Sequence, residues 1–274
     1  MAPQVTASEQ TGQLDTVMHE ARLFPPPPEF AAKARIKSLA EYEKLWNEAA
    51  GDIEKFWGHL AKELHWFQPY TKVLEWNEPF AQWFVGGKTN ASYNCLDIHL
   101  NSATRNKAAI IWEGEPGEQR TLTYQELHHE VCKFANALKK LGLKTGDVAS
   151  IYMPMTPELA IAMLACARIG VVHSVIFGGF SSEAIADRNN NAKAKLVITA
   201  DAGWRRGQQL PLKANVDAAL AKSPTVKHCI VLRRVGIPID MQSGRDHWWH
   251  ELVSAASADC PATPLDSEAP LYIL

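Results

Sequence analysis

Two adjacent glycines, Gly178 and Gly179, lie between an apolar run and a segment that can begin a helix. The apolar run, residues 171–177, is typical of a buried strand, and Ser181 or Ser182 can cap the helix that follows. Glycines in a strand–turn–helix segment let the backbone approach a ligand closely, and a helix N-terminus favours an anion. The segment therefore predicts either a phosphate-binding turn or an ordinary connection between a strand and a helix.

Two adjacent arginines, Arg205 and Arg206, lie in the segment ADAGWRRGQQLPLK, which follows the apolar run KLVITA. If KLVITA is a strand of a doubly wound sheet, the arginines lie beside the ligand crevice, at the carboxyl ends of the strands. The planar fork of a guanidinium group matches two phosphate oxygens. The arginines therefore indicate phosphate recognition, with a solvated basic loop as the alternative.

Several patterns of known chemistry are missing. The dinucleotide pattern GxGxxG and the phosphate-loop pattern GxxxxGK[ST] do not occur, which disfavours a Rossmann oxidoreductase. The sequence HWWH places His247 and His250 three residues apart, but no third ligand type is nearby, so we interpret its tryptophans as packing residues rather than part of a metal site. The residues alone thus predict an anion-binding edge and show no reaction centre.

The elements that must position these residues alternate along the chain from Leu122 onward. Thr123 and Glu126 have the spacing of a capping box at the start of an apolar helical stripe, and Gly142 lies where that helix would end. Strands that alternate with helices of about ten to fifteen residues predict an α/β fold with a mainly parallel, doubly wound sheet. The expected strands are GDVASIYM, residues 171–177, KLVITA and VKHCIVL, and the expected helices cover about 123–142, 156–170, 181–190 and 210–221.

The N-terminal third has a different composition. Residues 1–37 are polar and aperiodic before the run Pro25–Pro28, which predicts a mobile arm with a proline-rich spacer. Residues 38–97 contain helical periodicity, with Ser38 and Glu41 at capping-box spacing, and many aromatic residues. Because few basic residues accompany the aromatics, we interpret them as packing residues of a helical domain rather than as a nucleic-acid surface.

Bulk properties narrow the class of protein. A net charge of -2 over 274 residues gives no general attraction to nucleic acid or to an anionic membrane. No apolar run reaches the ~18–20 residues of a membrane span, and the N-terminus lacks a secretory signal, so we expect a cytoplasmic protein. An odd number of cysteines without metal-type spacing predicts reduced thiols. They are Cys95, Cys132, Cys166, Cys229 and Cys260.

From about residue 22 to the last residue, an ordered series of motifs resembles the acetyl-CoA synthetases, AMP-forming acetate–CoA ligases of the adenylate-forming superfamily. The motifs include FPPPPEF, WFQPYTKVLEWNEPFAQWFVGG, GDVASIYMPMTPELAIAMLACARIG, HSVIFGGFSSEAIADR and PLKANVD. The resemblance implies a two-step ligase: acetate and Mg-ATP form acetyl-adenylate and diphosphate, and the thiol of coenzyme A (CoA) then displaces AMP. It also implies a helical N-terminal domain over residues 38–97 and the first part of an AMP-binding (adenylation) domain over residues 98–274.

The resemblance implies which phosphate the glycine turn would meet. In the family, the segment matching FGGF lies against the nucleotide part of CoA, which implies that role for Phe177, Gly178 and Gly179. The arginine matching Arg205 binds a CoA phosphate in the family. We therefore expect one of the phosphates of CoA, rather than of ATP, at this turn.

This sequence departs from the family pattern at the next basic position. Many relatives carry a second arginine three residues after the first, where this chain has Gln208. The amide of Gln208 can donate a hydrogen bond without a charge, and Arg206 is the nearest alternative. Ile98 also stands where relatives commonly have arginine.

The resemblance further implies that important machinery lies beyond Leu274. In the family, the strand matching PLYIL leads into a Ser/Thr/Gly-rich loop that holds the ATP phosphates. The acetate pocket, the Mg²⁺-binding acid and the catalytic lysine also follow. We therefore expect a truncated adenylation domain that has no catalytic residue or metal ligand and is inactive alone, with acetate, ATP, CoA and the missing C-terminal part of the enzyme as partners. The alternatives are a ligase for propionate or another short acid, and a non-catalytic CoA-binding or assembly module.

Overall fold

The computed structural model describes residues 24–274, so most of the expected N-terminal arm lies outside the described residues. The chain forms two compact units, the first ending at Phe56 and the second covering Trp57–Leu274. In the first unit, helix α1 covers Pro28–Lys33 and α2 covers Leu39–Gly51. Pro28 fits the first position of α1 because its φ is fixed and an N–H at that position needs no helical partner.

Only half of the expected capping box forms at the start of α2. The Ser38 hydroxyl accepts the N–H of Glu41 at 3.2 Å. The Glu41 carboxylate, however, accepts the N–H of Lys37 at 2.6 Å rather than that of Ser38. Helix α3, Ile53–Leu60, follows after one residue and continues into the second unit.

Residues 57–97 differ from the expected helical domain, because a β-hairpin lies in their middle. Strand β1, Lys72–Asn77, pairs antiparallel with β2, Phe80–Val85. Valine, tryptophan and phenylalanine occur in these strands and favour extended backbone. The helical periodicity upstream forms α3 and does not extend into this segment. The rings of Trp66, Tyr70 and Phe84 pack on one another with centroids 5.1–5.3 Å apart. The short elements that follow are β3 Lys88–Thr89, α4 Ala91–Cys95 and the 3₁₀ turns Asp97–His99 and Ala103–Asn106.

The main sheet of the second unit has six parallel strands in the order β12-β11-β8-β6-β7-β14. This confirms the predicted α/β fold with a parallel sheet. The two edge strands are short, and β14 corresponds to the strand expected in PLYIL. The strands are β6 Val148–Tyr152, β7 Val172–Val175, β8 Leu196–Ala200, β11 His228–Leu232, β12 Asp246–Trp248 and β14 Tyr272–Ile273.

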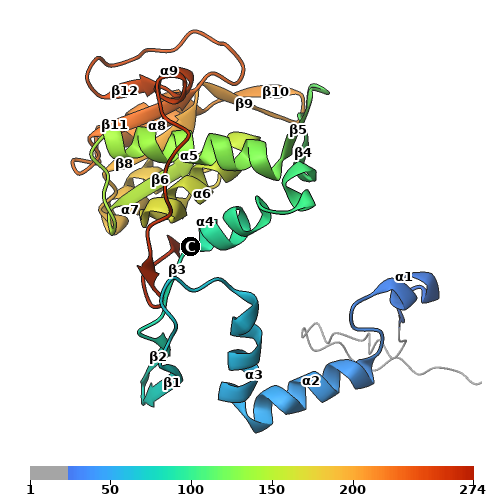
Figure 1. Cartoon of the computed structure of the whole chain (residues 1–274). Coiled ribbons are helices and arrows are strands. Elements are labelled where there is room, and N and C mark those ends of the chain that lie inside the picture. Colours follow the sequence, from blue (N-terminus) through green and yellow to red (C-terminus); the bar gives the residue numbers. More distant parts are fainter. Residues whose placement is uncertain (1–23) are drawn as a thin grey trace, which may run out of the picture. The chain divides into compact units, whose positions relative to one another are not determined.

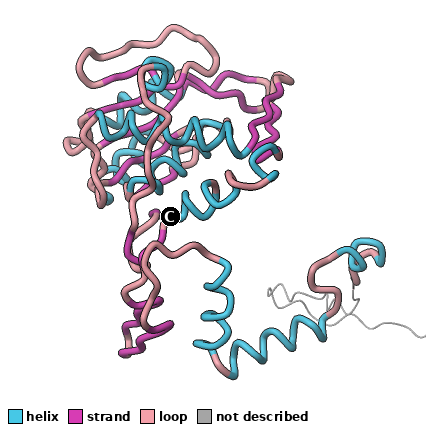
Figure 2. Tube along the Cα trace, in the orientation of Figure 1, coloured by secondary structure: helices cyan, strands magenta, loops and turns pink. Residues whose placement is uncertain are grey.

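Helices cover both faces of this sheet, as a doubly wound fold requires (Figures 1 and 2). One apolar core joins one face to α5 Tyr124–Lys140, α6 Pro157–Ile169 and α9 Trp249–Ser254. A second core joins the opposite face to α7 Ser182–Ala192 and α8 Leu212–Leu220. The complete capping box at Thr123 and the left-handed Gly170 after α6 confirm two of the predicted helix ends. The HWWH segment also packs as predicted, since Trp249 stacks on Phe134 with ring centroids 3.7 Å apart.

The strand order creates a switch point beside β6. The chain passes from β6 to β7 on one side and then to β8 on the other side. In a doubly wound sheet, ligands bind at the carboxyl ends of the strands beside such a switch. Two hairpins lie at this end of the sheet (Figure 1): β4 Ala108–Glu113 with β5 Gln119–Thr123, and β9 Ala202–Arg205 with β10 Gln208–Pro211.

Two further findings concern the described residues as a whole. No helix within residues 24–274 is long and apolar enough to cross a membrane. All five cysteines are free, as predicted, and burial raises the pKa of Cys166 to about 12. Strand β13, Leu265–Asp266, completes the elements by pairing with β3.

Candidate functional site

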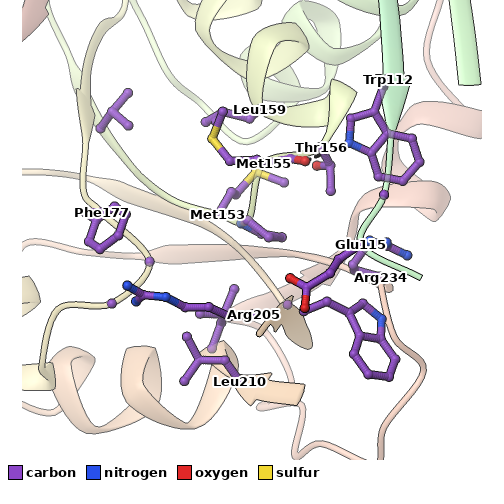
Figure 3. A pocket seen from close by; sticks show the side chains of 18 of the residues that line it. Trp112, Glu115, Met153, Met155, Thr156, Leu159, Phe177, Arg205, Leu210 and Arg234 are labelled. Atoms are coloured by element: carbon purple, nitrogen blue, oxygen red, sulfur yellow. Dashed lines mark hydrogen bonds between the residues drawn. The ribbon is translucent and has the colours of Figure 1, made fainter. Parts of the chain in front are cut away.

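A cavity of about 380 Å³ lies where the switch point predicts a ligand crevice. Residues 153–156 after β6, residues 175–179 at the end of β7, and residues 203–205 in β9 line it, together with residues of the β4–β5 hairpin (Figure 3). Four of the six residues expected to bind a ligand are among the lining residues: Phe177, Gly178, Gly179 and Arg205. Arg206 and Gln208 are exposed and do not line it.

A buried tyrosine forms hydrogen bonds with the backbone of the glycine turn. The side chain of Tyr152, at the end of β6, is fully buried, and its hydroxyl lies 3.0 Å from the carbonyl oxygens of both Gly178 and Phe180. The amide of Asn215 donates to the same hydroxyl at 3.4 Å. Burial raises the pKa of Tyr152, so the hydroxyl stays protonated and can donate a hydrogen bond to the turn. The path of the turn is therefore fixed by the core.

Arg205 lies over the glycine turn in a cation–π arrangement. Its guanidinium carbon is 5.2 Å from the centre of the Phe177 ring. The absence of a side chain at Gly179 makes this possible, because a Cβ there would lie 2.6 Å from Nη1 of Arg205 and 2.8 Å from the Phe177 ring. Gly178 has no such constraint, since its Cβ would come no closer than 3.6 Å to another atom.

The segment expected as a basic loop is a β-hairpin. Strands β9 and β10 are antiparallel, and Arg205 pairs with Gln208 across a two-residue turn. The turn residues Arg206 and Gly207 have φ of 54° and 74°, as a type I′ hairpin turn requires. Arg206 thus occupies the turn itself, while Arg205 and Gln208 end the two strands.

The opposite wall of the cavity comes from residues that the sequence analysis did not identify. The indole N–H of Trp112 donates to the carbonyl oxygen of Met155 at 2.8 Å. Arg234 lies over the Trp112 ring at 5.1 Å and forms an ion pair with Glu118 at 2.7 Å. Glu115 accepts a hydrogen bond from the backbone N–H of Gly207. These contacts join residues far apart in sequence, and no local pattern signals them.

A buried carboxylate fixes the loops around the cavity. Asp201 is fully buried at the end of β8. It accepts four backbone N–H groups, those of Ala202, Arg234, Val235 and Gly236, at 2.5–3.1 Å. A carboxylate with several N–H partners is well satisfied, so the start of β9 and the segment after β11 are tied together.

The electrostatics of the cavity differ between its two walls. Arg234 is neutralised by Glu118, whereas the guanidinium group of Arg205 has no hydrogen bond or ion pair with any residue in 24–274. An exposed guanidinium beside an apolar cavity can bind a phosphate oxygen pair, and the Phe177 ring offers a surface for stacking. The arrangement therefore fits a ligand with both a planar apolar part and an anionic part. Within the described residues, no group of three or more His, Cys, Asp or Glu side chains could hold a metal ion.

Two protein families match the sequence. The family described as "AMP-binding enzyme" matches residues 99–274, and "Acetyl-coenzyme A synthetase N-terminus" matches residues 42–95. The acetyl-coenzyme A synthetases of Chlorobaculum tepidum and Rhodopirellula baltica are 52% and 56% identical to this chain over 100% and 99% of its length. The chain spans only 42% and 41% of those relatives.

A solved structure shows the same fold. Acetoacetyl-CoA synthetase from Streptomyces lividans superimposes with a TM-score of 0.77 over 90% of this chain and 38% of its own length, at 24% sequence identity. The parallel sheet and the cavity both lie within the segment that the AMP-binding family matches. The chain therefore belongs to the AMP-binding enzyme family.

Proposed function

We propose that the chain is the N-terminal portion of an AMP-forming acetate–CoA ligase and that its cavity is part of the CoA site. The observation that carries the proposal is the position of Arg205, which lies over Phe177 at the cavity without an anionic partner among residues 24–274. Relatives more than half identical to the chain are acetyl-coenzyme A synthetases, which supports acetate as the acid.

The lining residues supply complementary contacts for CoA. The Phe177 ring offers an aromatic face to the adenine, and Arg205 offers its fork to a phosphate. Gln208 pairs with Arg205 across the hairpin and can donate an amide hydrogen bond to the same phosphate. In this proposal Gln208, rather than the turn residue Arg206, takes the place of the second arginine of many relatives.

The remaining substrates belong to the rest of the enzyme in this proposal. We assign acetate, the ATP phosphates and Mg²⁺ to the part of the relatives that this chain does not span, and we expect the chain alone to be inactive. We also propose that residues 38–97 form the N-terminal domain and residues 98–274 the first part of the adenylation domain, which the two family matches support.

Calorimetric titration of the 274-residue chain with CoA tests the proposal. We expect saturable binding, and Arg205→Gln should weaken it by roughly tenfold to a hundredfold, because a charge-assisted hydrogen bond contributes about 1.5–3 kcal/mol. Arg105→Gln, at an exposed position of the 3₁₀ turn Ala103–Asn106 outside the cavity, is the control for the loss of one positive charge. Absence of saturable binding by the unchanged chain would overturn the proposal.

A second measurement concerns catalysis. We expect no acetate-dependent exchange of labelled pyrophosphate into ATP by this chain, because adenylation depends on charges placed around the ATP phosphates. Robust exchange would show that the ATP site lies within the present residues.

A further inference from the structure

Glu115 connects the two hairpins at the mouth of the cavity. It lies between β4 and β5, lines the cavity, and accepts the backbone N–H of Gly207 between β9 and β10. In Figure 3 its carboxylate points toward the hairpin that carries Arg205. A negative charge thus lies at the wall where the proposed ligand would place its phosphates.

The N–H of Gly207 is available to an anion because of the geometry of the turn. In a two-residue hairpin, the ladder of hydrogen bonds ends at the residues that flank the turn, here Arg205 and Gln208. The central N–H groups take no part in the ladder. One of them, that of Gly207, donates to Glu115 instead. Gly207 follows Arg205 by two residues in the chain, and both Arg205 and the Glu115 side chain that accepts this N–H line the cavity.

We propose that Glu115 occupies an anion position of the ligand-free cavity and that a phosphate group of the ligand displaces it. This inference rests on the proposed CoA site. A phosphate has more charge and more acceptor oxygens than a carboxylate, so it competes well with Glu115 for the N–H of Gly207 and can also bind Arg205. A ligand with only a carboxylate has no such advantage over Glu115. Glu115 is therefore a specificity-determining residue that favours phosphorylated ligands.

Two substitutions separate the charge of Glu115 from its hydrogen bond. Glu115→Gln removes the charge but keeps an oxygen that can accept the N–H of Gly207, and Glu115→Ala removes both. We expect both variants to bind CoA about threefold to tenfold more tightly than the unchanged chain in calorimetry at low salt. The gain should shrink as salt increases, because screening weakens the repulsion that the substitution removes.

Glu251→Gln is the matched control, since it makes the same change of charge at an exposed position of α9 outside the cavity. Its affinity for CoA should equal that of the unchanged chain. If the unchanged chain binds CoA and neither Glu115 variant binds more tightly, the inference is wrong while the proposed function stands. Weaker binding by Glu115→Ala alone would make Glu115 a positioning residue and would also overturn the inference. If no form binds CoA, the proposed function fails and the inference fails with it.

Discussion

Arg205 and Gln208 lie directly opposite each other at the ends of β9 and β10. Side chains of directly opposed residues in an antiparallel pair project from the same face, with Cβ atoms about 4.5–5.5 Å apart. Arg206 is excluded from this arrangement because it forms the turn. In the hairpin, therefore, the side chain of Gln208 lies beside that of Arg205, and the side chain of Arg206 belongs to the turn.

Replacing Gln208 with arginine should create a second guanidinium beside Arg205. We expect Gln208→Arg to increase the affinity for CoA by about threefold to tenfold, because a phosphate would gain a second charged donor. Without ligand, two like charges across the hairpin should lower the free energy of unfolding by at most about 1 kcal/mol. Calorimetry measures the affinity, and urea denaturation measures the stability.

Arg206→Asn is the control for this prediction. Asn-Gly is the preferred pair for a type I′ turn, so the substitution removes the charge and keeps the hairpin. Its affinity for CoA should stay within about threefold of that of the unchanged chain, in line with an exposed charge outside the cavity. A loss as large as that of Arg205→Gln would instead assign Arg206 the role of the second arginine.

The sequence predicted the parallel sheet and its covering helices because these follow from local periodicity. Gly178, Gly179 and Arg205 were indicated by their positions after predicted strands, and Phe177 by the family resemblance. It did not predict the β9–β10 hairpin, since the turn pair Arg206–Gly207 lacks the Asn-Gly or Asp-Gly signal of a type I′ turn. The wall built by Trp112 and Arg234 was also missed. Those residues meet only through the fold, at the end of the sheet that the strand order defines.

The two glycines of the turn should respond differently to an added methyl group. Gly179→Ala would place its Cβ 2.6 Å from Nη1 of Arg205, so the guanidinium must leave the Phe177 ring. We expect CoA binding to weaken about threefold to tenfold, with little change in stability because the arginine is exposed and can move. Gly178→Ala should weaken binding less, since its nearest contact with the protein would be 3.6 Å and Arg205 need not move. Equal effects of the two substitutions in calorimetry would show that the turn, and not the position of Arg205, governs binding.

The buried carboxylate of Asp201 should contribute strongly to the stability of the folded chain. Asp201→Asn replaces one acceptor oxygen by an NH₂ group that faces backbone donors. We expect the free energy of unfolding to fall by about 2–4 kcal/mol, because buried N–H groups lose their partner. Urea denaturation measures this loss. Asp187→Asn, at an exposed position of α7, should change stability by less than about 0.5 kcal/mol.

A second charged cluster lies away from the cavity and joins the segment before β4 to α5 and α6. Arg168 is almost completely buried and contacts both carboxylate oxygens of Asp97 at 2.8 Å. The ring of His128 lies 3.3 Å from Asp97 and 3.5 Å from the buried thiol of Cys132. The negative charge of the Asp97 carboxylate, at the centre of the cluster, favours the protonated form of His128.

This cluster should lower the free energy of unfolding both as the pH rises above neutral and as the pH falls into the acid range. Its hydrogen bond to Asp97 raises the pKa of His128 to about 9, even with the guanidinium of Arg168 3.3 Å from the same ring nitrogen. Although burial opposes ionisation, the hydrogen bonds from Arg168 and His128 lower the pKa of Asp97 to about 2.

Because the pKa of His128 is higher in the folded chain than in the unfolded chain, its contribution is complete below about pH 6.5 and is lost as the pH rises through 9. The contribution of Asp97 is complete above about pH 4 and is lost as the pH falls toward 2. We therefore expect the free energy of unfolding to fall by about 1–3 kcal/mol between pH 6.5 and 9. The measurement is the unfolding temperature, which should decline over the same range. His128→Gln should abolish most of this decline, whereas His250→Gln, on the exposed face of α9, should preserve it. An equally steep decline in the His128→Gln variant would assign the pH dependence to other groups.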